Sequence, residues 1–358
     1  MSKSYIAAID DSGTAKSVVD WHGNLIPATF PFVGLASVLL DPDALDELNG
    51  RWNHLMSKLQ RSLKTPEPPE VHLRQMWGKT LPTKNNPYLG TRFRDIRAWL
   101  TEARNIILSL MRDADTFSVY TEFANRESFA KGLSSYYRDP AFAPEFAFFR
   151  AHKTKGTTGA LYKTYHSITS SPLVRNLADI LWRIDEDLTA NTNGMASVLV
   201  DRFSGTAGID AKAVLDASKN LAGLSRIAEI NQVNSPNPPI SQVADFFAYS
   251  YNRLLLMENE LIRRDAQFLE VVSPFMFNAR SLDGWSISEP FDRPSSTYNT
   301  TLCVIYALAR NELFRRDPRF VEEHMITVEE FHDIAKSIPP DTFTGISVIR
   351  AESLVRGT

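Results

Sequence analysis

The sequence predicts an α/β protein built on a five-stranded sheet. The prediction rests on short apolar runs of strand length that lie between long segments with a helical spacing of apolar residues. The first run, residues 4–10, has the length and composition of a buried central strand. It stops at the carboxylates Asp10 and Asp11, and Ser12 and Gly13 then turn the chain. Further strands are expected at 28–40, 115–122, 196–201 and 226–231.

Composition and charge limit the classes of protein to be considered. The chain has 358 residues, of which 43% are hydrophobic and 23% are charged, as in globular proteins with a substantial core. Its formal net charge is -3, so a nucleic-acid partner has to be met by a local basic patch. The longest apolar runs are too short for a membrane span, and we expect no membrane partner.

The cysteine content and the N-terminus both bear on the compartment. Cys303 is the single cysteine, which excludes an intrachain disulfide and a cysteine-based zinc site. The N-terminus enters the first strand almost directly, without the charged and apolar regions of a signal peptide. These features favour a cytoplasmic protein.

Long helices are expected between the strands and after the last strand. Asp41 is a suitable cap, and Pro42 suits the first turn of a helix that extends to about Leu63. An amphipathic pattern predicts a second helix from Phe93 to Met111. The other expected helices lie at 171–188, 211–221, 241–262, 301–315 and 328–337.

A short segment between the first two helices carries an acid and a histidine. Glu70 and His72 are two residues apart, so on an extended chain their side chains point to the same side. They line a cleft in one interpretation. In the other, they are polar residues on a half-buried edge strand that face water.

Residues 146–178 form a window without any Asp or Glu. Basic residues alternate there with Tyr162 and Tyr165, a combination that suits phosphate contacts and base stacking in nucleic-acid binding. The alternative is a solvated helix face above core aromatic residues. The candidate nucleic-acid-binding residues of this window are Arg150, Lys153, Lys155 and Lys163.

The order of the expected strands and helices is that of a ribonuclease H-like fold with helices on both faces of a mixed five-stranded sheet. In that fold the first and fourth strands are neighbours, and the last helix packs across them. We expect one such domain at 1–262, with helical insertions at about 42–113 and 123–190. Residues 263–358 are expected to form a mainly helical C-terminal extension.

Acidic residues occupy comparable places in this order. Asp10, with its neighbour Asp11, ends the first strand, Asp201 ends the fourth, and Asp245 lies in the first turns of the last helix. In such a fold these acids converge on two Mg²⁺ or Mn²⁺ ions, about 3.5–4 Å apart, which activate water and stabilise the leaving oxygen of a phosphodiester. Hard cations of this kind prefer oxygen ligands. Alternatively, Asp10 and Asp11 only cap a turn, because Asp-Ser-Gly is common in turns.

Three short motifs resemble, in the same order, those of a broad family of uncharacterised prokaryotic proteins. They are I-D-D-S-G at 9–13, E-V-H at 70–72 followed by M-W-G-K, and S-Q-V-A-D at 241–245. Members of the family begin with D-E-S-G, carry an E-I-H-like segment, end in Q-x-A-D and are grouped with ribonuclease H-like nucleases. The resemblance covers about residues 4–258 and implies a metal-dependent nuclease. Asp11 stands where the family has Glu, so its carboxylate is kept on a shorter side chain.

The acids and the resemblance together give a set of expected site residues. The expected metal ligands are Asp10, Asp201 and Asp245, and Asp11 joins them as an expected catalytic residue. Gln242 lies three residues before Asp245 on the same helical face, where it could hold a ligand or a phosphate. The residues expected around the metal are Ser12, Glu70, His72 and Gln242, of which Glu70 and His72 supply an outer ligand or a proton relay, and the choice between Asp185 and Glu186 as a further acid is open.

The leading hypothesis is a nuclease that depends on Mg²⁺ or Mn²⁺ and cleaves DNA or RNA. Its setting, inferred from the resemblance, is defence against phage or mobile elements. One alternative is a catalytically weak nucleic-acid-binding module. Another is a structural subunit of a larger complex or a homo-oligomer, with residues 263–358 as the docking surface.

Overall fold

The structure is a computed structural model of the whole chain. It describes part of the sequence in detail. The expected helices at 301–315 and 328–337, and most of the one at 211–221, lie outside the described residues. The described residues are 3–13, 17–20, 24–27, 31–78, 86–127, 129–130, 166, 170–192, 194–201, 212, 214–216, 219, 224–233 and 238–277.

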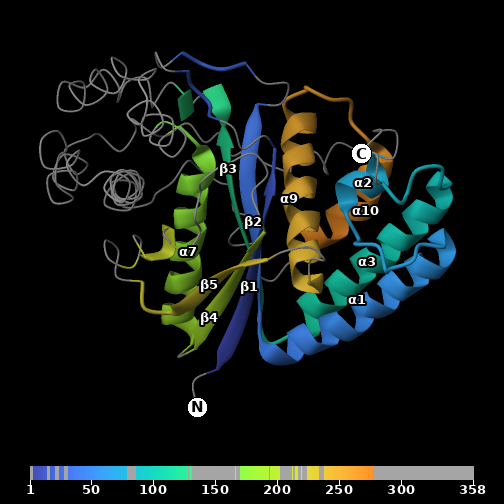
Figure 1. Cartoon of the computed structure of the whole chain (residues 1–358), viewed down its shortest axis with the longest axis horizontal. Helices are drawn as coiled ribbons and strands as arrows, with labels where there is room; N and C mark the ends of the chain where they lie inside the picture. The colour runs from blue at the N-terminus through green and yellow to red at the C-terminus, as the bar shows by residue number, and fades with distance from the viewer. Residues whose placement is uncertain are drawn as a thin grey trace, which may run out of the picture.

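A five-stranded mixed sheet forms the centre of the molecule (Figure 1). The strand order is β3-β2-β1-β4-β5, with antiparallel pairing between β1 and β2 and between β2 and β3. The β1–β4 and β4–β5 pairs are parallel. The prediction of a mixed five-stranded sheet is thus confirmed. The strands are β1 (Ser4–Ser12), β2 (Phe32–Leu40), β3 (Phe117–Asn125), β4 (Met195–Asp201) and β5 (Ile227–Val233).

The register of β1 and β4 brings two of the expected site residues to one edge. Ile9 pairs with Val200 in the parallel ladder, so the next residues, Asp10 and Asp201, lie side by side where the two strands end. A parallel pair leaves the carboxyl ends of both strands at the same edge of the sheet. The neighbouring position of these two acids therefore follows directly from the fold.

Helices cover both faces of the sheet, as the sequence predicted (Figure 1). On one face α7 (Pro172–Asn191) packs against β2 and β3. On the other face α9 (Pro239–Glu258) packs against β1 and β2, and further helices cover its outer side. Because α9 lies between two layers, most of its side chains are buried, including the polar Gln242 and Asp245. A polar residue in such a helix needs partners or a function.

The outer layer consists of α1 (Pro42–Leu63), α2 (Leu73–Trp77), α3 (Phe93–Asp113) and α10 (Ala266–Phe277). The first of these begins as predicted, because the Asp41 side chain accepts a hydrogen bond from the Ala44 N–H at 3.0 Å. In chain order, α1, α2 and α3 lie between β2 and β3.

The first part of the expected C-terminal extension is described. Phe268, Leu269, Val271 and Val272 of α10 belong to the same hydrophobic core as α3 and α9. The division of the chain at residue 262 stays a prediction. Among the described helices, none has both the length and the hydropathy of a membrane-spanning segment.

A carboxylate pocket as the candidate functional site

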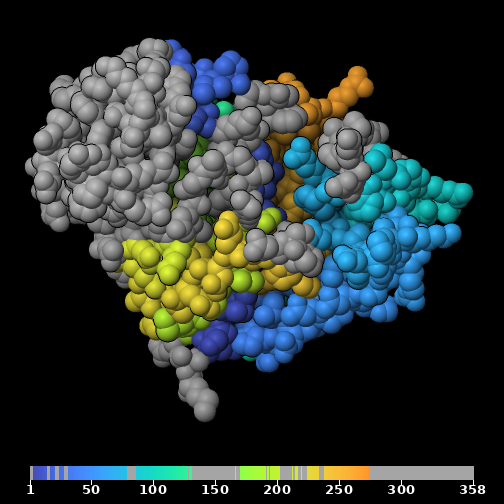
Figure 2. Space-filling model, viewed as in Figure 1, coloured from blue at the N-terminus to red at the C-terminus, as the bar shows by residue number. Residues whose placement is uncertain are grey.

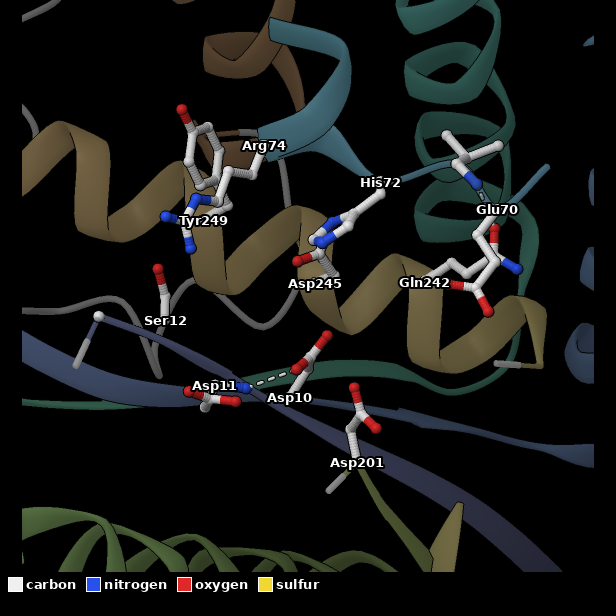
Figure 3. Close-up of a pocket in the computed structure, with 12 residues that line it drawn as sticks. Asp10, Asp11, Ser12, Glu70, His72, Arg74, Asp201, Gln242, Asp245 and Tyr249 are labelled. Atoms are coloured by element: carbon white, nitrogen blue, oxygen red, sulfur yellow. Dashed lines mark hydrogen bonds and ion pairs between the residues drawn. The ribbon is translucent and has the colours of Figure 1, made fainter. Parts of the chain in front are cut away.

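A cavity of about 220 Å³ lies where β1 and β4 end, beneath α9 and beside the segment 70–74 (Figure 3). Five carboxylates that the sequence singled out line it: Asp10, Asp11, Asp201 and Asp245 come from β1, β4 and α9, and Glu70 comes from the segment before α2. Its lining residues are Asp10, Asp11, Ser12, Gly13, Glu70, Val71, His72, Arg74, Asp201, Gln242, Asp245 and Tyr249.

Asp10 is the most enclosed of the acids at the strand ends. Its side chain is buried and reaches toward α9, and its Oδ1 accepts a hydrogen bond from the Asp11 N–H at 2.7 Å. Burial raises the pKa of Asp10 well above its usual value, and the charges of Asp245, Asp201 and Asp11 raise it further. A buried acid among acids is electrostatically unfavourable and calls for a cation or a proton.

The side chain of Asp11 points in a different direction from the side chains of its neighbours Asp10 and Ser12. Successive side chains of a strand alternate between the two faces, and Asp11 lies on the side of β1 away from α9, whereas Asp10 and Ser12 lie toward that helix (Figure 3). Burial, followed by the charges of Asp201 and Asp245, raises the pKa of Asp11 from 3.8 to about 7. Asp11 thus belongs to the same electrostatic cluster without facing Asp245.

Asp245 reaches the pocket from the second turn of α9 and makes two contacts with the segment opposite. Its Oδ2 lies 2.8 Å from Nδ1 of His72 and accepts the Leu73 N–H at 3.2 Å. Because a carboxylate only accepts, Nδ1 carries the proton in this pair, and Nε2 remains for other partners. The charge of Asp245 raises the pKa of His72. The structure thus ties the histidine of the E-V-H motif to the acid of the Q-V-A-D motif.

Gln242 holds the same segment in place one turn earlier on α9. Its Oε1 accepts hydrogen bonds from Trp52 Nε1 at 2.9 Å and from the Val71 N–H at 2.7 Å. These two bonds satisfy both acceptor positions of the side-chain oxygen. Gln242 lines the pocket as expected, but its oxygen positions the chain around Val71 and does not point to a ligand.

The remaining expected neighbours of the site also line the pocket. Glu70 and His72 both face it, which favours the cleft interpretation of this segment over the edge-strand one. Ser12 follows the acid pair, and Gly13 then has a φ of +104°, with the position of an added Cβ only 2.5 Å from the Phe32 carbonyl oxygen. Only glycine fits this turn, so the turn that ends β1 is sterically specified.

Of the pocket residues absent from the sequence-based set, Arg74 and Tyr249 carry polar side chains. Arg74 brings a cation into a pocket of acids, and its charge lowers the pKa of Asp11 against the larger effects of burial and the other acids. Tyr249 lies one helical turn beyond Asp245, so the i, i+4 spacing on α9 could have identified it. Arg74 belongs to the five-residue helix α2, which is too short to give a periodic signal.

Other acids considered from the sequence lie elsewhere. Asp185 of α7 accepts the Arg226 N–H at 2.5 Å, and neither Asp185 nor Glu186 lines the pocket. The candidate nucleic-acid-binding residues Arg150, Lys153, Lys155 and Lys163, like Tyr162 and Tyr165, lie outside the described residues.

The donor set of the pocket fits a hard divalent cation. Its acids offer oxygen ligands, and burial, followed by the charges of Asp245, Asp201 and Asp11, raises the pKa of Asp10, so a positive charge among these acids would be favourable. In the part of the chain that the structure describes, no group of three or more His, Cys, Asp or Glu side chains is already arranged to hold a metal. Asp245, for example, is turned to His72. Binding a cation therefore requires side-chain rotation.

Comparisons with known proteins give no match from which a function could be inferred, so the inference of function depends on the geometry of the pocket. The chain matches no family model, no curated protein and no solved structure.

Proposed function

We propose that this protein is a divalent-metal-dependent hydrolase of nucleic-acid phosphodiester bonds with a ligand site of the ribonuclease H-like type. One observation carries the proposal: carboxylates from the ends of two adjacent parallel strands and from a helix that crosses them line one pocket. The strand order 3-2-1-4-5, with only β1–β2 and β2–β3 antiparallel, is also that of a ribonuclease H-like sheet.

The cation would be held by Asp10, Asp201 and Asp245. A bound Mg²⁺ or Mn²⁺ supplies positive charge for the attacking and leaving oxygens of a phosphodiester. Asp10 and Asp201 lie on neighbouring strands, so the sheet fixes their separation, while Asp245 can approach them by leaving His72.

Two other pocket side chains have chemistry that suits a phosphodiester. Arg74 presents a guanidinium, whose fork of N–H donors matches the non-bridging oxygens of a phosphate. His72 lines the same pocket, and its imidazole is released for a new partner when Asp245 leaves it for the cation. In that state His72 can donate a proton to a leaving oxygen.

Cleavage of end-labelled single-stranded and double-stranded DNA and RNA tests the proposal. We expect products with Mg²⁺ or Mn²⁺ and none after chelation by EDTA. Arg74→Ala should reduce cleavage about 100-fold, because a charged hydrogen bond to the phosphate is lost. Arg112→Ala, which removes an exposed cation at the end of α3, is the matched control and should leave cleavage unchanged.

The outcomes separate this proposal from the binding-module alternative. Metal-dependent binding of the labelled strands without cleavage under any of these conditions supports a module that has kept the site for recognition. Cleavage that persists in EDTA contradicts the metal-dependent hydrolase.

A further inference from the structure

One contact in the carboxylate pocket ties Asp245 of α9 to the outer helical layer. Its Oδ2 lies 2.8 Å from Nδ1 of His72 and accepts the Leu73 N–H at 3.2 Å. His72 directly precedes α2, and Leu73 is the first residue of that helix. The helices α1 to α3, coloured blue to teal, form one side of the molecule in Figure 2. We refer to the two bonds together as the Asp245 clasp.

The clasp and a bound cation make conflicting demands on the same carboxylate. In Figure 3 the Asp245 carboxylate is directed to the ring of His72, and the carboxylates of Asp10 and Asp201 come from the strand side of the pocket. In the part of the chain that the structure describes, these three acids do not form a group that could hold a metal. Ligand oxygens lie about 2.0–2.6 Å from Mg²⁺ or Ca²⁺, so Asp245 has to turn from the clasp to join the other two acids on an ion.

Other side chains hold the chain on both sides of the clasp. Before it, the Val71 N–H donates to Oε1 of Gln242 at 2.7 Å. After it, Trp77 Nε1 donates to Oδ2 of Asp265 at 3.0 Å. Neither bond involves Asp245, so the two donors of the clasp keep their places when that carboxylate turns away. They can therefore recapture it, and the clasp and the cation compete reversibly.

We propose that the Asp245 clasp is an autoinhibitory contact, which competes with the divalent cation for Asp245 and so sets the cation affinity of the carboxylate pocket. The inference rests on the proposed function, because it takes Asp245 as a cation ligand. A ligand that binds only one of two states has its apparent Kd raised in proportion to the rarity of that state. Loss of the clasp should therefore tighten cation binding, even though a polar residue of the pocket is removed.

The test measures Mn²⁺ binding to the full chain by isothermal titration calorimetry, without nucleic acid. His72→Phe keeps an aromatic ring and removes the donor to Asp245. His72→Asn removes the imidazole but keeps a donor in the same place, because its amide nitrogen, like Nδ1 of histidine, is bonded to Cγ. His54→Phe is the matched control, because it makes the same substitution at an exposed histidine of α1 that does not line the pocket.

The expected result is a gain in affinity in one variant only. His72→Phe should bind Mn²⁺ about tenfold more tightly than the parent protein, because one hydrogen bond to a charged group no longer opposes the cation. His72→Asn and His54→Phe should bind Mn²⁺ as the parent protein does. Thermal melting in EDTA checks that each variant is folded. If His72→Phe does not fold, the smaller His72→Ala takes its place with the same expectation.

Several outcomes would overturn the inference. Unchanged Mn²⁺ binding in His72→Phe does so, and weaker binding would make His72 itself a ligand. Equal gains in His72→Phe and His72→Asn would trace the effect to the loss of the imidazole and not to the bond with Asp245.

The cleavage assay above separates this inference from the proposed function. The expected gain in Mn²⁺ affinity without any cleavage retains the clasp and contradicts the hydrolase. Metal-dependent cleavage without the gain contradicts only the clasp. A lack of Mn²⁺ binding by the parent protein and by every variant contradicts both.

Discussion

Two buried carboxylates of the same sheet, Asp10 on β1 and Glu122 on β3, have opposite surroundings. Glu122 is 4% exposed and meets Nη1 of Arg183 at 3.0 Å, so its charge is compensated by a helix on the α7 face. Asp10 is 6% exposed, and its charged neighbours are further acids. Similar burial thus accompanies a closed ion pair in one region and an excess of negative charge in the other.

These surroundings indicate that Glu122 stabilises the fold and that Asp10 does not. A buried ion pair satisfies its own charges, and its removal leaves a charge without a partner. A cluster of buried acids weakens the protein on its own and is explained by a ligand that brings positive charge. The contrast predicts that substitutions of Glu122 change stability, whereas substitutions of Asp10 change activity.

The largest expected effect is on cleavage by Asp10→Asn. The change keeps the shape of the side chain and removes one ligand charge, so we expect cleavage to fall at least about 1,000-fold, equivalent to ~4 kcal/mol of transition-state stabilisation. Initial rates with Mg²⁺ measure it. Glu122→Gln is the matched control, because it removes the same charge from a buried acid of the sheet and should cleave normally. Normal cleavage by Asp10→Asn would remove this aspartate from the catalytic site.

The second-largest effect is on the stability of the fold, and we expect it for Glu122 and not for Asp10. Glu122→Gln removes the buried carboxylate that meets Nη1 of Arg183 at 3.0 Å, and we expect the free energy of unfolding to fall by about 2 kcal/mol. Urea denaturation measures it. Glu102→Gln, which breaks the more exposed pair with Lys58, should cost less than about 0.5 kcal/mol. Equal losses in the two variants would show that burial does not distinguish these pairs.

A smaller effect is expected on the stability of the metal-free Asp10→Asn protein. The substitution relieves the repulsion among the pocket acids, so its free energy of unfolding should hold or rise, by about 1 kcal/mol. Thermal melting in EDTA tests this. A marked fall in Tm would instead identify Asp10 as a turn residue, the alternative that the sequence left open.

The smallest effect concerns pH. The pKa of Asp11 is raised from 3.8, the value of an ordinary Asp, to about 7. The folded, metal-free protein therefore holds the Asp11 proton more tightly than the unfolded chain, and the stability that this proton contributes at low pH is lost as the pH rises to about 7. The raised pKa of His72 acts in the same direction. A cation replaces the protons, so Mg²⁺ should raise Tm by about 2–4 °C more at about pH 8 than at about pH 6.

The matched variant for this pH effect is Asp11→Asn. It lacks the titrating carboxyl, so the difference between the Mg²⁺ effects at the two pH values should shrink. A Mg²⁺ effect that is the same at both values in the parent protein would contradict the coupling between the cation and the protons of the pocket.

Much of the arrangement could be predicted because it depends on local sequence. Apolar runs predicted the strands, and the position of Asp10 and Asp201 at strand ends was enough to place them together once β1 and β4 were neighbours. The alternation of a strand could also have shown that Asp11 points away from Asp10.

The rest depends on partners far apart in the chain. The role of Gln242 follows from Trp52, which is 190 positions earlier and meets it only after α1 packs on α9. The bond between His72 and Asp245 likewise joins positions 173 residues apart. No local pattern records such contacts, so the sequence could place these residues in the site without assigning what they bind.

The proposed function depends on the binding of a divalent cation by the acids at the ends of β1 and β4 and on α9. Crystals of the full chain grown or soaked with Mn²⁺ test it most directly, by anomalous diffraction. We expect an anomalous peak among the carboxylates of Asp10, Asp201 and Asp245, with Asp245 turned from His72 toward the ion. A peak elsewhere, or an empty pocket with Asp245 still bound to His72 at saturating Mn²⁺, would contradict it.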